Sequence, residues 1–203
     1  MRILVVLLAA ALAASCASQP AVVAQASAPA KSGRAVVATL TLENPGFESK
    51  RGESDNCAGG WSCSMHADPR SFTFKPLEAG AGGGARSFCV EAVGKEPWAN
   101  LTQGLHDVTM ARGARVRFSA AVKLEAVTGE GAGPMIIAQG RGGETIAHAQ
   151  VLATGERAWQ RVEVEMDVPQ ATTVLEVGMT FTGRGRACLD DARLDVLAPA
   201  GPV

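Results

Sequence analysis

A strict alternation of apolar residues with other residues is the feature that most constrains how this chain folds. From Arg115 to Glu125 every second residue is apolar, and the same period of two runs from Gln160 to Val168 and from Thr172 to Phe181. A strand with one face in a core and the other in water has this period, which is typical of antiparallel sheets. The central part of the chain is therefore predicted to be antiparallel β structure.

Shorter apolar stretches predict further strands, and clusters of glycine predict the turns between them. The further strands are expected at Val36–Leu42, Phe72–Lys75, Phe88–Ala92, Leu101–Val108, Met135–Gln139, Ile146–Leu152 and Ala187–Val196. The turns are expected at Gly80–Gly84, Gly129–Pro134, Gly140–Gly143 and Gly183–Gly185. About ten short strands without a helical period predict an all-β, antiparallel two-sheet sandwich as a single domain.

The first residues have the layout of an export signal. A positive start, Met1-Arg2, precedes an apolar run that ends in small residues and is too short to span a bilayer comfortably. Its end, Leu12-Ala13-Ala14-Ser15-Cys16, resembles a bacterial lipobox, which implies cleavage before Cys16 and a lipid on its sulfur. Ala17 follows the cysteine, and in diderm bacteria this implies the outer membrane. The alternative is an ordinary secretory signal cut after Ala17 or Ala26, which gives a secreted or periplasmic protein.

These features divide the chain into four parts. Residues 1–15 form the signal peptide, 16–34 a flexible tether, 35–198 the β-sandwich and 199–203 a tail. The tether is rich in Ala, Ser, Gln, Val and Pro and has no usable period. The membrane is contacted through the lipid only. A formal net charge of −1 excludes a protein that binds nucleic acid through a basic surface.

Four cysteines remain after Cys16, and an even number in an exported chain favours disulfides. Cys57 and Cys63 flank a short glycine-containing turn. Cys89 lies between two inward-facing residues and points outward. Cys188 also points outward if a β-bulge occurs just after it, so the two can meet across neighbouring strands. A zinc site is the rival reading, which the lack of a C-x-x-C pair and the export signal both disfavour.

Four pieces in order resemble carbohydrate-binding modules of the galactose-binding-domain-like jelly-roll superfamily. They are Leu42–Glu48 with Trp61 downstream, Trp98–Gln103, Ala158–Val162 and Leu189–Leu194. The resemblance covers most of residues 38–197 and implies a jelly-roll β-sandwich. Fold alone does not define function, since many proteins with this fold bind no sugar.

The bulge expected at Asp190-Asp191 turns a carboxylate toward the edge of the sandwich. The resemblance implies structural calcium there, with Asp190 as one ligand and Glu48 as a second. The alternative is that Asp190 accepts hydrogen bonds from backbone N–H groups or pairs with an arginine.

Sugar binding in such modules relies on exposed aromatic rings supported by polar groups. Trp61, Trp98 and Trp159 all occupy positions where the resemblance implies an aromatic that packs in the fold. Packing is expected for Trp61 and Trp159, whereas Trp98 follows a proline in a polar loop and is expected to be exposed. The side chains expected to support Trp98 as ligand-binding residues are those of Gln139, Arg141, Lys123 and His66.

Signals of catalysis are weak. The three histidines are scattered, and neither a G-x-S-x-G nor an H-E-x-x-H motif is present. The pair Glu163 and Glu165 lies on a solvent face, where nothing tunes a catalytic acid. The prediction is a non-catalytic, lipid-anchored module of the bacterial cell envelope that binds a glycan or polysaccharide. The alternative is a structural or protein-interaction lipoprotein that kept the fold without a sugar site.

Overall fold

The computed structural model describes residues 33–54 and 56–199, and within them every regular element is a β-strand. The predicted all-β class is confirmed. The strands are β1 (Val36–Leu40), β2 (Ser62–Met65), β3 (Phe72–Leu77), β4 (Ser87–Ala92), β5 (Trp98–Leu105), β6 (Arg115–Gln139), β7 (Thr145–Gln150), β8 (Ala153–Asp167) and β9 (Val174–Leu197). All paired strands run antiparallel.

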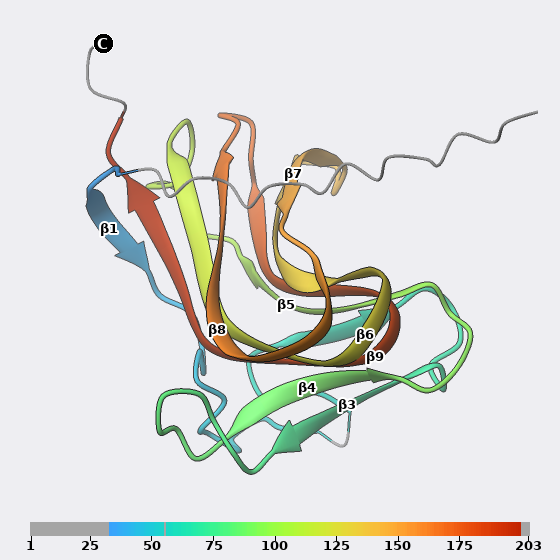
Figure 1. Ribbon diagram of the computed structural model, residues 1–203. Coiled ribbons are helices and arrows are strands. Elements are labelled where there is room, and N and C mark those ends of the chain that lie inside the picture. The colour runs from blue at the N-terminus through green and yellow to red at the C-terminus, as the bar shows by residue number, and fades with distance from the viewer. Residues whose placement is uncertain (1–32, 55, 200–203) are drawn as a thin grey trace, which may run out of the picture.

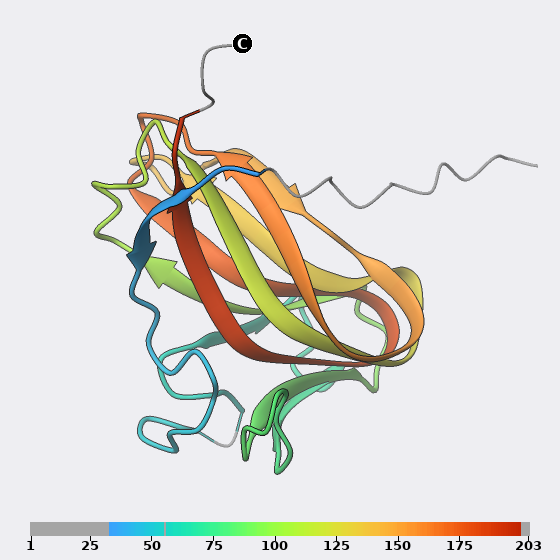
Figure 2. The ribbon, with the colours of Figure 1, turned by 60° about the vertical axis from the view of Figure 1, so that its left-hand side comes forward.

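One nine-stranded sheet curls over on itself to form two layers, because β6 and β9 each run through both (Figure 1). In the first layer, residues 115–125 of β6 lie between β8 and residues 186–197 of β9, and β1, β4 and β3 continue from β9. In the second layer the order is β2-β5-β9-β6-β7. Figure 2, turned by 60°, shows the long bent strands side by side.

The bends of β6 and β9 fall on glycines that the sequence predicted to be turns between separate strands. That prediction is wrong at Gly129–Pro134 and at Gly183–Gly185, where the ladder continues with register shifts. Gly183 has a φ of 137°, and a Cβ there would collide with the carbonyl oxygen of Thr128. Only glycine combines that conformation with so close an approach. Two predicted strands therefore become one bent strand in each case.

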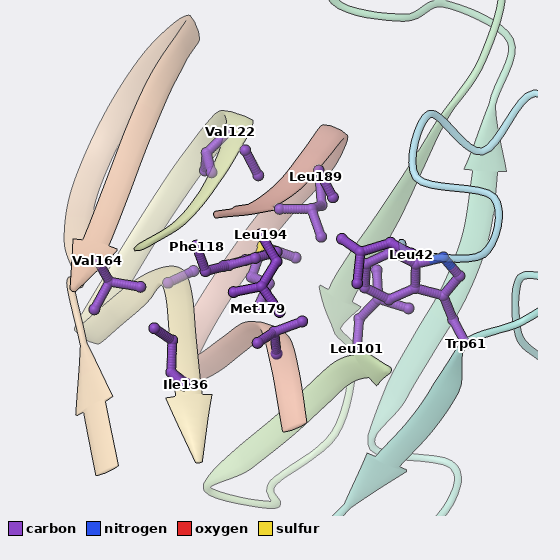
Figure 3. Close-up of a cluster of buried hydrophobic side chains, with 14 of the residues drawn as sticks. Leu42, Trp61, Leu101, Phe118, Val122, Ile136, Val164, Met179, Leu189 and Leu194 are labelled. Carbon is purple, nitrogen blue, oxygen red and sulfur yellow. The ribbon is translucent and has the colours of Figure 1, made fainter. Parts of the chain in front are cut away.

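The core lies between the two layers and is formed by the residues that alternate inward. Figure 3 shows Phe118 and Leu194 of the first layer facing Ile136 and Met179 of the second, and all four are fully buried. This interdigitation of two inner faces is what the sequence period predicts for a sandwich. Strand β2 was not predicted, because a segment of only four residues, Ser-Cys-Ser-Met, is too short to show a period.

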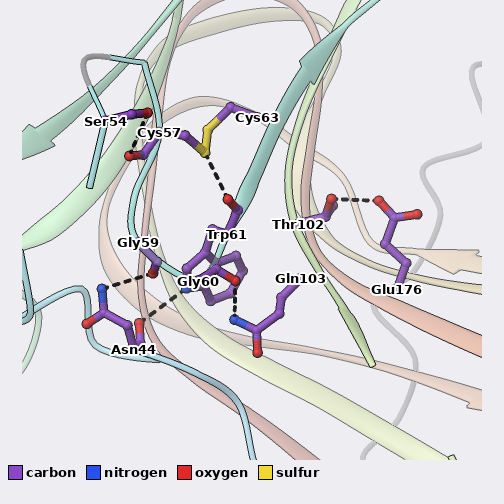
Figure 4. The surroundings of a disulfide bond; sticks show 10 residues. All are labelled: Asn44, Ser54, Cys57, Gly59, Gly60, Trp61, Cys63, Thr102, Gln103 and Glu176. Atoms are coloured by element: carbon purple, nitrogen blue, oxygen red, sulfur yellow. Dashed lines mark hydrogen bonds between the residues drawn. A yellow bond between two sulfur atoms is a disulfide. The ribbon is translucent and has the colours of Figure 1, made fainter. Parts of the chain in front are cut away.

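The predicted disulfides are present, and of the three possible connectivities the structure has Cys57–Cys63 with Cys89–Cys188. Cys89 and Cys188 are directly opposite each other on β4 and β9. The shorter bridge closes the loop that carries Trp61 (Figure 4). Together the two bridges fix the loop before β2 and the join between β4 and β9.

The opening motif Leu42–Glu48 forms a turn that is held by side chains from other strands. Asn44 donates from Nδ2 to the carbonyl of Gly59, and its own carbonyl accepts a hydrogen bond from Nε1 of Trp61. Gln103 of β5 donates to the carbonyl oxygen of Glu43 and to that of Gly60, the second of which is shown in Figure 4. These hydrogen bonds join Leu42–Glu48 to Trp61 and to Gln103, which belong to separate segments of the motif set.

The predictions for the signal peptide, Cys16 and most of the tether lie outside the described residues. Among the residues that are described, no helix is long and apolar enough to cross a membrane.

Candidate functional site

The outer surface of the second layer brings together several of the residues predicted to bind a ligand. Along β5, Ala99 and Leu101 enter the core. The alternate residues Trp98, Asn100 and Thr102 therefore point outward. Figure 4 shows Thr102 and Gln103 directed to opposite sides of the strand. We call this outer surface the β5 face and define it by His66, Trp98, Asn100, Thr102, Gln139 and Glu176.

Trp98 stands at one end of the β5 face. Its side chain is half-buried and lies outside the hydrophobic core cluster. The ring of His66 contacts it edge-on, with 6.0 Å between ring centroids and an interplanar angle of 76°. Nδ1 of His66 lies 2.6 Å from Oε2 of Glu96, which fixes the imidazole beside the indole. Trp98 is therefore a partly exposed aromatic ring with a polar neighbour.

A row of polar groups crosses the β5 face from β5 to β6. Thr102 donates from Oγ1 to Oε1 of Glu176 at 2.6 Å, and Gln139 donates from Nε2 to Oε2 of the same carboxylate at 3.1 Å. Oδ1 of Asn100 is buried and has no hydrogen-bond partner among the described residues. Buried acceptors in folded proteins are nearly always paired, so this unpaired oxygen is an uncommon feature of the layer beneath the β5 face.

Two predicted members of the site lie elsewhere. Lys123 is on the outer surface of the first layer, where its Nζ is 2.7 Å from Oε1 of Glu125. Arg141 lies in the loop between β6 and β7, beside Arg112 and Glu144. The alternation of residues along a strand shows that a side chain points outward, but it does not show on which of the two layers that side chain lies. The bend of β6 therefore places Lys123 on the other layer from Trp98, whereas His66 and Gln139 share the face of Trp98 and Arg141 lies in the loop just beyond Gln139.

The other two tryptophans differ from each other. Trp61 is buried and packs against Phe47 with ring centroids 4.9 Å apart, as predicted. The prediction that Trp159 packs in the core is wrong, because this side chain is half-buried and outside the core cluster. Its parity matches that of the charged residues Arg161 and Glu163, a signal that places it on the outer surface.

Asp190 lies at the predicted bulge, where one residue of β6, Ala120, is opposite two of β9. Its side chain is 1% exposed, and its two oxygens accept hydrogen bonds from the N–H groups of Ala81 and Asp191 at 2.6 and 2.7 Å. Burial, and then the neighbouring carboxylates of Asp191 and Glu48, raise the pKa of Asp190 to about 6.

The same geometry tests the expected calcium site. Oε1 of Glu48 accepts from the N–H groups of Ala85 and Arg86, so the nameable ligand oxygens already serve backbone donors. This is the alternative that the sequence left open for Asp190. Within residues 33–54 and 56–199 no group of three or more His, Cys, Asp or Glu side chains forms a metal site. A calcium ion would have to displace these hydrogen bonds, and calcium ligation by Asp190 and Glu48 stays a prediction.

The carboxylate pair considered for catalysis is neutralised by arginines. Glu165 contacts Arg115 and Arg117 at 2.8 Å, and Glu163 lies 3.7 Å from Arg117. Both carboxylates are therefore engaged in ion pairs with arginines. This ladder of ion pairs ties β6 to β8.

The two layers and their connectivity define an antiparallel jelly-roll β-sandwich. The xylan-binding domain CBM22-1 of Xyn10C from Paenibacillus barcinonensis shares the fold, with a TM-score of 0.56 and 17% identity over 84% of this chain and 100% of that one. The tandem CBM22-1-CBM22-2 of the same protein gives 0.57 and 18% identity, covering 86% of this chain and 50% of the tandem.

A third similar structure is the enzymatically active domain of tailspike protein 4 from bacteriophage CBA120. Its TM-score is 0.57 at 14% identity, over 76% of this chain and 21% of that one. No protein-family model matches the chain, and no curated protein sequence matches it either. At these identities the likeness establishes the fold, and the function has to be argued from the residues of this chain.

Proposed function

We propose that this chain is a non-catalytic carbohydrate-binding module that holds a glycan or polysaccharide on its β5 face. The observation that carries the proposal is the placement of Trp98 at one end of a row of outward-facing polar groups. An indole ring stacks on the apolar C–H face of a pyranose, and this leaves the hydroxyl groups of the sugar free for hydrogen bonds. The nearby row offers such bonds.

The polar row supplies a hydrogen-bond acceptor in a fixed position. The carboxylate of Glu176 is already held by Thr102 and Gln139, so it keeps a fixed orientation without rearranging when a ligand arrives. A carboxylate held in place by two side chains supports recognition of a hydroxyl-rich ligand.

The ligand class is also supported by the similar structures, since the Paenibacillus domain is described as xylan-binding. We further propose that the module is exported and tethered to the bacterial cell envelope, at the outer membrane, through a lipid on Cys16. The sequence of the first sixteen residues supports this proposal. A calcium ion at Asp190 and Glu48 would be a structural addition, away from the β5 face.

The experiment is a binding screen of the full-length chain against immobilised xylan, other plant polysaccharides and envelope glycans. Retention on at least one glycan, with NMR shifts at the indole N–H of Trp98, supports the proposal. If the folded protein is retained on none of them, the alternative of a structural or protein-interaction lipoprotein replaces it.

A further inference from the structure

The outer surface of the first layer carries a second partly exposed tryptophan. Val122 of β6 is opposite Gln160 of β8, whereas Leu124 is opposite Arg157, so one residue of β6 is opposite two of β8. The extra residue is a bulge at Ala158-Trp159 opposite Lys123, and bulges re-aim side chains. Since Val164 and Met166 enter the core, the parity of β8 directs Trp159 outward.

A positive charge without a carboxylate partner lies on the same face. Arg161 is two residues beyond Trp159, about 7 Å along the strand. Its side chain is exposed, and its Nη2 donates to Oγ of Ser119 at 2.9 Å. In the described part of the chain no carboxylate lies within ion-pair distance of Arg161, whereas Arg193 pairs with Asp195.

The guanidinium of Arg161 also lines a hollow of about 410 Å³. The hollow lies between β8, the end of β1 and the bulge of β9, and Arg193 and Asp191 line it too. Sites for small molecules usually measure about 300–1,000 Å³, so this volume suits a ligand of that size. An arginine fork binds a carboxylate with two parallel hydrogen bonds, and it is one of the strongest anchors for that group.

We propose that this surface, defined by Trp159, Arg161 and the hollow beside Arg193, is a second sugar site that takes a hexuronate residue of an acidic polysaccharide. A pyranuronate carries an apolar C–H face and a carboxylate on one ring, which matches an indole with a guanidinium beside it on one strand. The site extends the proposed glycan binding to the opposite layer, and it does not require the β5 face to bind any ligand.

The probe is trigalacturonate, and its methyl ester is the matched ligand with the same rings but no charge. Calorimetric titration of the full-length chain is expected to show binding of the acid and at least tenfold weaker binding of the ester. Arg161→Gln is expected to weaken binding of the acid by a similar factor, and Trp159→Ala to abolish it. Arg157→Gln, on the same strand, and Trp98→Ala, on the β5 face, are expected to leave it unchanged.

Three results would overturn the proposal: no binding of trigalacturonate, equal binding of acid and ester, or a loss that follows Trp98 instead of Trp159. The last of these would leave the β5 face as the sugar site, so failure of the two proposals can be told apart. If Trp159→Ala does not fold, the indole N–H signal of Trp159 in the wild type serves instead. A signal that does not move on adding the acid contradicts the site.

Discussion

At the scale of single residues, the buried carboxylate of Asp190 has the most strongly shifted pKa described in this fold. A carboxylate with 1% exposure has lost its water, and two backbone N–H groups replace it only in part. Its pKa of about 6 against an ordinary value of 3.8 means that the folded protein holds this proton more tightly than the unfolded chain does. Stability must therefore depend on pH through this residue.

The direction in which stability changes with pH follows from the difference in bound protons between the folded and unfolded states. Between pH 4 and pH 6 the unfolded chain has released the proton of Asp190 and the folded protein still holds it, so stability falls as the pH rises through this range. A rise of two pKa units corresponds to about 3 kcal/mol. We expect the unfolding free energy of the wild type, relative to that of Asp190→Asn, to fall by up to this amount between pH 4 and pH 7. Urea titrations at both pH values measure it, and a constant difference would contradict the burial of a titrating group.

Calcium would act on the same carboxylate. If Asp190 and Glu48 ligate it, a cation bound only by the folded state raises the melting temperature by mass action. We expect added calcium to raise the melting temperature of chelator-treated wild type above pH 6 and to have no effect on Asp190→Ala. An unmoved wild-type curve would show that Asp190 only serves backbone N–H groups.

The tryptophans show what residue-level reasoning can and cannot reach. The burial of Trp61 was predictable because it belongs to a motif whose other members, Leu42 and Phe47, are apolar and buried. Trp159 was misplaced because the motif was given more weight than the parity of Arg161 and Glu163 beside it. Sequence reasoning also missed Asn100, Thr102 and Glu176, since a polar residue on a strand looks the same whether or not it faces a ligand.

At the scale of elements, the period of two located every long strand but not the continuity of β6 and β9. Glycine clusters usually end strands, and a sequence contains no direct sign that the hydrogen-bonded ladder resumes beyond them. In this fold the glycines let a strand leave one layer and enter the other. The bulge at Asp190 was predictable, because it reverses the parity of apolar residues within one strand.

The bend of β9 at Gly183 allows a direct test of the requirement for glycine there. Gly183→Ala is expected to destabilise the protein by about 3 kcal/mol or more, because a positive φ and a collision with the carbonyl of Thr128 act together. Gly143→Ala is the matched control, since its φ is also positive, at 81°, but open space surrounds the added methyl. We expect the control to lose only about 1 kcal/mol. Equal losses in urea unfolding would show that the bend does not depend on the close approach.

At the scale of the whole molecule, two layers give the chain two outer faces, and only the structure assigns residues to them. Gln139 and Lys123 lie on the same strand, yet the bend of β6 sends them to opposite layers. The predicted disulfide Cys89–Cys188 joins β4 to β9 in the first layer. The sandwich and its bridges were therefore predictable, whereas the composition of the β5 face was not.

Attachment to a membrane is also a property of the whole chain. Replacing Cys16→Ser removes the acceptor of the lipid, and we expect the protein to move from the membrane fraction to the soluble fraction of a bacterial host. Mass spectrometry of the wild type is expected to show the added acyl chains. A wild type without lipid and an unchanged distribution of the variant would favour the secreted or periplasmic alternative.

The most direct measurement is a titration of xylan oligosaccharides, or of the glycan found by the screen, into wild type and Trp98→Ala. Loss of the stacking ring is expected to cost about 2 kcal/mol or more and to weaken binding at least tenfold, with an unchanged circular dichroism spectrum. Trp159→Ala, on the other layer, is expected to bind the same neutral glycan as the wild type does. A folded Trp98→Ala protein that keeps wild-type affinity would contradict glycan binding on the β5 face.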